Sequence, residues 1–188
     1  MNSKSSEQLL QQLLQGNLAR FQDILDWYAD DVLRLSYLLL WDEDEARDIL
    51  QETMLKLVQM LKQGKIKNAN GSIKGLLLTI AKNLSINRLK QRSRFTRIDE
   101  KQMEPTRLAK IKTPQQEIQS ADFSKAFDLA LEQLTDIQRA IIVLHDVNSE
   151  SPKDIAQSLN LTVENVRMHL CRARRKLRQI LAPYADEL

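Results

Sequence analysis

The sequence predicts an all-α protein of two small helical domains joined by a linker. Apolar residues make up 43% of the 188 residues and recur at helical spacings of three and four, which suits two small cores. Charge is segregated, with six acids and one arginine in residues 42–52 and six basic residues without an acid in residues 82–97. We expect the domains to span residues 1–95 and 121–188, with the linker at residues 96–120.

The first domain is predicted to open with helices over residues 7–14 and 18–40, separated by a Gly-Asn pair that interrupts helical structure. Trp27, and Trp41 just after the second helix, allow two interpretations. They either stack on nucleic-acid bases or pack in the core. Packing is favoured because both residues lie within apolar stripes.

A third helix begins at the acids of residues 42–45, where the positive end of the helix dipole favours negative charge, and continues to about Leu61. One of its faces is apolar and is expected to pack. At about 100° per residue, the opposite face gathers Asp48, Gln51, Glu52 and Leu55. The residues alone leave open a solvated acidic face and a docking surface, and a leucine among the acids favours docking.

Residues 63–72 have the glycine and asparagine content of a loop, and Ser72 is predicted to cap a helix over residues 73–91. The end of this helix is basic. Because Phe95 is the only aromatic residue among these charges, charge rather than base stacking is expected to dominate any nucleic-acid contact. Asn83, on one edge of the helix, either faces water or contacts a base.

The second domain is predicted to contain four helices. Before it, residues 98–120 contain two prolines, mixed charge and weak periodicity, which indicates an interdomain linker. A helix is expected at residues 121–133. Thr135 and Gln138 then form a capping box that opens the next helix.

Residues 151–181 are predicted to form a helix-turn-helix. Ser151 caps the first helix, and Pro152 takes its first position, where a missing N–H costs nothing. Asn160 tolerates the left-handed conformation of a tight turn, and Thr162 caps the second helix. An apolar stripe along the second helix consists of Val166, Leu170, Ala173 and Leu177.

The outward side of the second helix is basic, which is typical of a helix that enters a DNA major groove. Side chains expected to approach base edges are Glu164, Asn165, Arg167, Met168 and Cys171. Arginines expected to neutralise phosphates are Arg172, Arg174 and Arg175. The alternative is a basic hairpin that docks a protein or is merely solvated. Caps, turn, stripe and charge together favour DNA binding.

Other function classes find little support. The sequence has no glycine-rich phosphate loop, and His145 and His169 have no partners at metal-ligand spacing, so we expect no enzyme, metal or cofactor. Cys171 is the only cysteine, which excludes an internal disulfide and fits a reducing compartment. A signal-peptide pattern and an apolar run of about 20 residues are both absent, so we expect a cytoplasmic protein without membrane insertion.

These motifs together resemble the extracytoplasmic-function group of bacterial RNA polymerase sigma factors over nearly the whole chain. DEDEARDILQETMLKL is similar to the helix that binds the polymerase clamp, and SIKGLLLTIAKNLSINRLKQRSR to the helix that melts and reads the minus-ten element. The segment LTDIQRAIIVLHDVNSESPKDIAQSLNLTVENVRMHLCRARRKL resembles the domain that reads the minus-thirty-five element. Two residues depart from the family's pattern: Leu76 stands where a tryptophan is common, and Asn87 where an acid is usual.

The resemblance implies a partner for each surface. Core RNA polymerase, through its clamp helices and flap, and promoter DNA are the implied partners, and an anti-sigma factor is a further candidate. Residues implied to contact polymerase are Asp48, Gln51, Glu52 and Leu55. Residues implied to contact the melted minus-ten element are Lys82, Asn83, Ile86, Asn87 and Lys90. The upstream duplex would contact Thr162 and the eight second-helix residues named above, while polymerase carries out the chemistry.

Two other classes each explain part of the chain. A stand-alone helix-turn-helix regulator accounts for the C-terminal half and predicts operator binding without polymerase, but the N-terminal half does not resemble an effector or dimerisation module. A nucleic-acid-processing enzyme or a structural RNA-binding protein accounts for the two basic surfaces, but lacks a catalytic constellation or leaves the acidic face unexplained. A sigma factor accounts for all three surfaces and is the function we predict.

Overall fold

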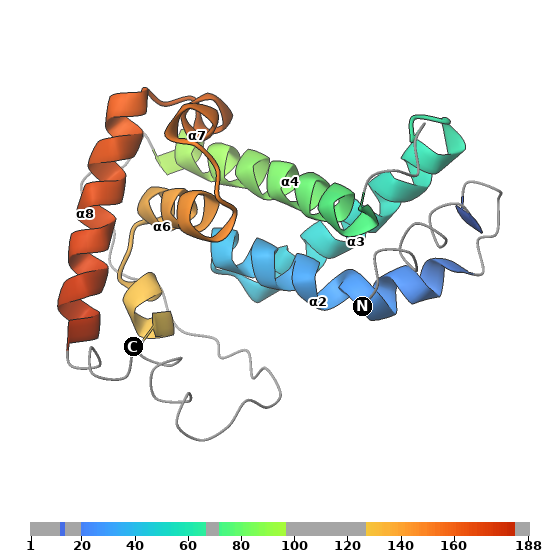
Figure 1. Cartoon of the computed structure of the whole chain (residues 1–188), viewed down its shortest axis with the longest axis horizontal. Helices are drawn as coiled ribbons and strands as arrows, with labels where there is room; N and C mark the ends of the chain where they lie inside the picture. The colour runs from blue at the N-terminus through green and yellow to red at the C-terminus, as the bar shows by residue number, and fades with distance from the viewer. Residues whose placement is uncertain (1–11, 14–19, 67–71, 97–126, 183–188) are drawn as a thin grey trace, which may run out of the picture. The chain divides into compact units, whose positions relative to one another are not determined.

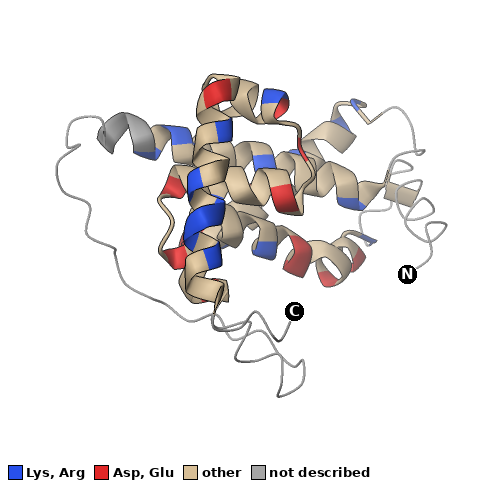
Figure 2. Cartoon of the chain, turned by 60° about the vertical axis from the view of Figure 1, so that its left-hand side comes forward, with Lys and Arg blue, Asp and Glu red and all other residues tan. Residues whose placement is uncertain are grey.

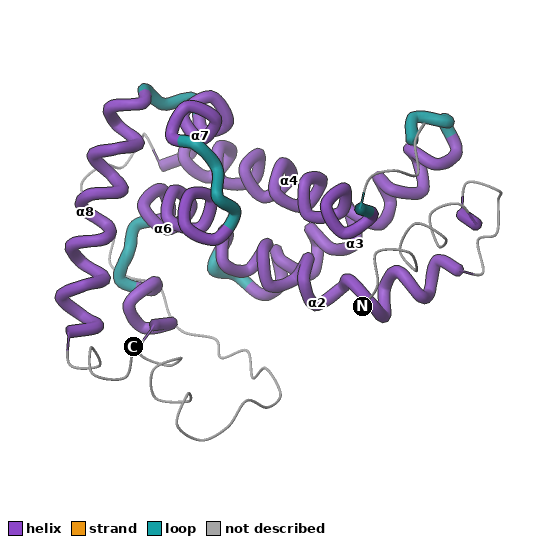
Figure 3. The backbone as a smooth tube through the Cα atoms, in the orientation of Figure 1, coloured by secondary structure: helices purple, strands orange, loops and turns teal. Residues whose placement is uncertain are grey.

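The computed structural model of the chain describes residues 12–13, 20–66, 72–96 and 127–182 (Figure 1). These residues form helices and connecting turns, and no strand occurs among them (Figure 3). The all-α prediction is therefore confirmed. No helix in this part of the chain is both long and apolar enough to cross a bilayer.

The chain divides into two compact units, residues 1–88 and 89–188. The division falls inside a helix, before the predicted domain end at residue 95. Most of the predicted linker, residues 96–120, and the predicted helix at residues 7–14 lie outside the described residues. The domain bounds therefore stay a prediction.

The N-terminal unit is built on α2 (Phe21–Leu40), α3 (Glu43–Lys62) and most of α4 (Ile73–Thr96). Helices α2 and α3 pack along each other, and α4 is tied to α2 by an ion pair of 2.7 Å between Lys74 and Asp31. Ser72 caps α4 as predicted, its hydroxyl accepting from the Gly75 N–H. The largest fully buried side chains of this unit are Ile24, Leu39, Leu40, Ile49, Leu57, Ile73 and Leu77.

A sharp turn joins α2 to α3. Trp41 adopts the left-handed conformation with φ of 55°, which is uncommon outside glycine, and its N–H donates to the Tyr37 carbonyl. The Trp41 ring stacks on that of Tyr37, with centroids 5.0 Å apart. Asp42 then caps α3 by accepting from the Glu45 N–H at 2.9 Å. Trp41 thus has an aromatic partner within its own unit, as the packing interpretation expects.

The C-terminal unit contains helical residues 127–132, α6 (Asp136–Ile142), a π-helical turn η2 (Val143–Val147), α7 (Pro152–Leu159) and α8 (Val163–Leu181). The predicted caps are confirmed: Thr135 and Gln138 form a capping box, and Ser151 and Thr162 each accept a backbone N–H. Asn160 occupies the turn between α7 and α8 with φ of 56°. The predicted helix-turn-helix is therefore present.

The π turn η2 was not predicted from the sequence. It is closed by a hydrogen bond of 3.0 Å from the Asn148 N–H to the Val143 carbonyl, and Ser149 follows in the left-handed conformation. Residues 140–144 before and within it are all buried. Because a π turn contains an extra residue, it changes the direction in which the side chains after this buried run project. His145 and Asp146 lie at that point.

Candidate polymerase and nucleic-acid interfaces

The predicted docking residues lie on the outward face of α3. Asp48 and Gln51 are exposed, and Leu55 has 62% of its surface exposed. The opposite face is packed by Ala46, Ile49, Thr53, Met54 and Leu57. An exposed leucine among polar groups leaves apolar surface that a partner can bury.

Glu52 differs from the other members of this face because it is already paired. Arg88 of α4 donates to the Glu52 carboxylate at 2.8 Å, and the two side chains are 30% and 44% exposed, respectively. This ion pair joins α3 to α4. The sequence offered no signal for it, since the residues are 36 positions apart.

The predicted minus-ten contacts on α4 fall into three classes. Asn83 and Asn87 are exposed, and their spacing of four residues places them on one edge of the helix. Lys82 and Lys90 are half-buried. Ile86 is buried, with 3% of its surface exposed, so it offers almost no surface to a base.

All the predicted upstream contacts around α8 are exposed, and basic residues follow the length of this helix in Figure 2. They are Thr162, Glu164, Asn165, Arg167, Met168, Cys171, Arg172, Arg174 and Arg175. The opposite stripe is buried at Val166, Leu170 and Ala173, whereas Leu177 is half-buried. The helix therefore divides into a packed side and a basic side, as its periodicity predicts.

One side of α8 is hollowed. The hollow has a volume of about 450 Å³ and is lined by Arg167, Leu170, Cys171, Arg174, Arg175 and Arg178. Guanidinium groups favour an anionic ligand, and three of the four here, on Arg167, Arg175 and Arg178, have no ion pair among the described residues, whereas Arg174 is paired with Asp146. Arg178 was not among the predicted contact residues, although its place in the basic run of α8 is visible in the sequence.

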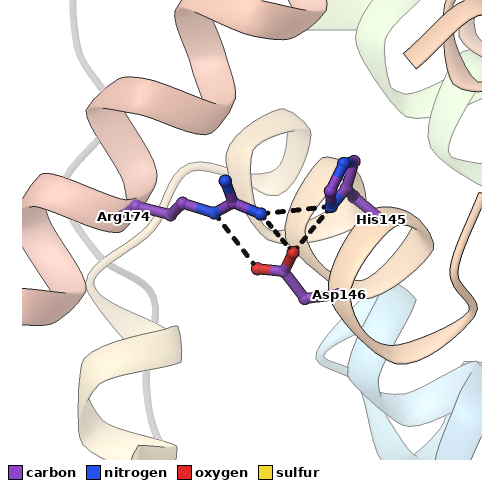
Figure 4. A network of polar contacts seen from close by, with 3 residues as sticks. All are labelled: His145, Asp146 and Arg174. Atoms are coloured by element: carbon purple, nitrogen blue, oxygen red, sulfur yellow. Dashed lines mark hydrogen bonds and ion pairs between the residues drawn. The ribbon is translucent and has the colours of Figure 1, made fainter. Parts of the chain in front are cut away.

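Arg174 takes part in a polar network with η2 (Figure 4). Its Nη2 donates to Asp146 Oδ1 at 2.5 Å and its Nε lies 3.4 Å from Oδ2, while His145 Nδ1 is 2.7 Å from the same Oδ1. Burial works to raise the pKa of Asp146, but hydrogen bonds from Arg174 and His145, with their charges, lower it below its ordinary value. The hydrogen bond to Asp146 raises the pKa of Arg174.

His169 lies on the other flank of α8. Its Nδ1 is buried without a hydrogen-bond partner among the described residues. Burial, followed by the charge of Arg172, lowers the pKa of His169 below its ordinary value. Both effects disfavour the protonated imidazole in the folded chain.

The chain matches two known families and several known proteins. Residues 25–95 match Sigma-70 region 2, and residues 124–177 match Sigma-70 region 4. The chain is 26% identical over 174 residues to the ECF RNA polymerase sigma factor SigE of Mycolicibacterium smegmatis, which covers 92% of this chain and 66% of that protein. It is 27% identical over 179 residues to the ECF RNA polymerase sigma factor SigW of Bacillus subtilis, covering 92% of this chain and 94% of that protein.

Among solved structures, the chain is similar to the sigma factor RpoE of Bartonella quintana in complex with the anti-sigma factor NepR. The TM-score is 0.50 at 21% identity, over 86% of this chain and 96% of that one, which supports a shared fold. The region 2 match accounts for the N-terminal half, which a stand-alone regulator does not explain. The chain belongs to the sigma-70 family, in the extracytoplasmic-function group, and its function is that of an RNA polymerase sigma factor in transcription initiation.

Proposed function

We propose that the chain docks on core RNA polymerase through the outward face of α3 and contacts promoter DNA through α4 and α8. The observation that carries the proposal is the exposure of Leu55 beside Asp48 and Gln51, on a helix whose opposite face is fully packed. Such a face binds a partner without disturbing the fold. Its acids suit a basic partner surface, here the polymerase clamp.

In the same proposal, the Asn83–Asn87 edge of α4 contacts the melted minus-ten strand. Both side chains are exposed, and an amide can donate to and accept from one base edge. Asn83 would hold an unstacked base, while Lys82 and Lys90 would supply positive charge beside it. Unstacking a base costs a few kcal/mol and is least costly at easily opened steps. Ile86 is not part of this contact because it is buried.

Helix α8 is proposed to bind the upstream duplex. Thr162 caps the helix, and the exposed residues of its first turns, among them Arg167, are assigned to base edges. Arg172 and Arg175 are assigned to phosphates because they are exposed and project away from the buried stripe. Polymerase carries out the chemistry, and the chain supplies recognition.

An anti-sigma factor is proposed as a second class of partner. The support is the RpoE structure, which is a complex with the anti-sigma factor NepR. For this chain, a sequestering partner that covers the α3 face would compete with polymerase for Leu55. We therefore expect anti-sigma binding and polymerase binding to be mutually exclusive.

The docking proposal is tested by the double variant Asp48→Ala with Leu55→Ala. Losing the burial of Leu55 costs about 1–2 kcal/mol, and losing a charge-assisted hydrogen bond at Asp48 costs about as much, so affinity for purified core polymerase should fall at least about tenfold. Asp30→Ala on α2 is a matched control, since Asp30 is also an exposed acid. Wild-type affinity in a double variant with normal circular dichroism would move the polymerase contact to another surface.

A further inference from the structure

One arginine of the proposed groove helix is held by the π turn η2 of the same unit. Arg174 presents both Nε and Nη2 to the two oxygens of Asp146, which is the fork geometry that suits a carboxylate. The other arginines of α8 that we assign to DNA, Arg167, Arg172 and Arg175, have no ion pair with any residue in the described part of the chain. The guanidinium of Arg174 is therefore paired with a carboxylate, which distinguishes it from those of Arg172 and Arg175.

His145 strengthens this arrangement (Figure 4). Its Nδ1 lies 2.7 Å from Asp146 Oδ1 and 3.2 Å from Arg174 Nη2. A nitrogen that carries a proton donates to the carboxylate and cannot accept from the guanidinium, and the shorter distance favours this tautomer. Asp146 Oδ1 then accepts from both Arg174 and His145.

The position of Arg174 around α8 explains why it reaches η2. At about 100° per residue, Arg174 lies about 70° from the middle of the buried stripe, whereas Arg175 lies about 170° away. Lys176 lies about 90° to the other side of the stripe. Its Nζ donates to the carbonyl of Gln133, at the end of the helix at residues 127–132. The helix is thus fixed on both flanks of its apolar stripe by polar contacts to two different elements.

The π turn presents Asp146 to α8. Residues 140–144 are buried, so the backbone must turn immediately after residue 144 for the next side chains to point outward. The widened turn makes this change, and π turns are frequent at functional positions. Asp146 and Arg174 are 28 residues apart in sequence, and their contact ties the segment before the helix-turn-helix to its second helix.

We infer that Arg174 is a positioning residue that sets the orientation of α8 through Asp146 and supplies no net positive charge to DNA. The inference rests on the proposed function of α8 in binding upstream duplex. The charge of Arg174 is compensated by Asp146, so it displaces no counterion from phosphates. By contrast, Arg175 is exposed on the side opposite the core and has no acidic partner among the described residues.

The test measures duplex binding by the full chain assembled with core polymerase, as a function of KCl concentration. One probe is a duplex that the wild-type holoenzyme selects from a randomised library, and the other is an unselected duplex of the same length. The variants are Asp146→Asn, Arg174→Gln, their combination, and Arg175→Gln. Asp30→Asn on α2 is the matched control, because it makes the same change of net charge on an exposed acid outside the C-terminal unit.

If Arg174 is a positioning residue, Asp146→Asn should change the affinities for the two duplexes in opposite directions. Asp146→Asn should weaken binding to the selected duplex about three- to tenfold although it adds a positive charge, and should strengthen binding to the unselected duplex. Arg174→Gln should weaken selected binding to a similar extent without changing the salt slope, and the combined variant should be no weaker than either single variant. Arg175→Gln should lower the salt slope by about 1.

Tighter binding of Asp146→Asn to the selected duplex, with a salt slope steeper by about 1, would overturn the inference and make Arg174 a phosphate contact that Asp146 quenches. Additive losses in the combined variant would also overturn it. Circular dichroism at the assay temperature excludes unfolding as the cause. If upstream duplex affinity is unaffected even by Arg175→Gln and Arg167→Ala, the proposed function of α8 fails, which is a separate outcome.

Discussion

In both units an ion pair holds an arginine of a proposed DNA-binding helix, but the two acids lie in different surroundings. In the N-terminal unit, Arg88 of α4 pairs with Glu52, which belongs to the proposed polymerase-docking face. In the C-terminal unit, Arg174 of α8 pairs with Asp146 of η2, which belongs to no proposed contact face. The first pair joins two candidate binding surfaces, and the second joins a binding helix to its scaffold.

The difference shows that a count of basic residues overstates the charge available to DNA. Arg88 and Arg174 both count as basic residues in the sequence, yet each has a carboxylate within hydrogen-bond distance. The consequence of releasing each arginine depends on what else its acid touches. Breaking the Arg88–Glu52 pair makes Glu52 of the docking face available to a partner, whereas breaking the Arg174–Asp146 pair removes a contact that orients α8.

The largest expected effect separates base contacts from phosphate contacts on α8. Arg167→Ala should relax specificity at one base pair by about 1–3 kcal/mol if its contact is bidentate. Arg172→Ala should instead weaken binding about equally across sequences and lower the salt slope by about 1. Both residues are exposed. Affinities for a set of single-base-pair variants of the selected duplex, each over a salt series, distinguish the two patterns.

This assignment would be contradicted if each of the two variants showed the pattern expected of the other. If Arg167→Ala lowers affinity equally for every sequence while Arg172→Ala changes sequence preference, the division between base and phosphate contacts is reversed. Lys153→Ala serves as the control, since Lys153 is an exposed basic residue on α7 to which no contact is assigned.

A second expected effect concerns pH, because Asp146 and His169 both have a lowered pKa and both titrate on the acid side of neutrality. The lowered pKa of His169 means that its unfolded form binds protons more readily than its folded form. Stability from this residue is complete above the ordinary value of 6.5 and is lost as pH falls through the lowered folded pKa. For Asp146, the same loss begins below its ordinary value of 3.8.

The variant His169→Gln should therefore flatten the dependence of the thermal midpoint on pH in the window that begins at the ordinary pKa of 6.5 and extends below it. Asp146→Asn should leave this window unchanged and flatten the profile only below about pH 4. Thermal unfolding followed by circular dichroism measures both. An unchanged slope just below pH 6.5 in His169→Gln would show that burial of its imidazole does not govern the acid response.

Much of the fold could be predicted from the sequence because its signals are local. Helix caps at Thr135, Ser151 and Thr162 depend on residues three positions away, and Asn160 suits the left-handed turn by its own chemistry. The faces of α3 and α8 follow from helical periodicity alone. Trp41 shows the limit of such rules, since it occupies a left-handed position that glycine or asparagine usually takes and is held there with Tyr37.

The state of each site residue could not be predicted, because it depends on contacts between distant segments. Glu52 and Arg174 are predicted contact residues because of the helix faces on which they lie. In the structure Arg174 is exposed and Glu52 is half-buried, which fits both predictions. Their partners, Arg88 and Asp146, are 36 and 28 residues away. The resemblance implies a minus-ten contact at Ile86, but packing of α4 buries this side chain.

The smallest expected effect sharpens the comparison in the N-terminal unit. The Glu52–Arg88 pair is partly exposed, and such pairs contribute at most about 1 kcal/mol. Arg88→Gln removes the internal partner of Glu52, so a basic polymerase surface no longer has to displace it. Affinity for core polymerase should rise by up to about fivefold, and less at high salt because exposed charges are screened.

The control makes the same Arg88→Gln substitution in a chain that lacks the Glu52 carboxylate. In a Glu52→Gln background, Arg88→Gln should leave polymerase affinity unchanged, because no pair remains to be released. The double-mutant cycle isolates the coupling between the two side chains. An equal loss of polymerase affinity on Arg88→Gln in the wild-type and Glu52→Gln backgrounds would mean that Arg88 itself contacts polymerase. The Glu52–Arg88 pair would then not join two separate binding surfaces, and the contrast with the Asp146–Arg174 pair would be lost.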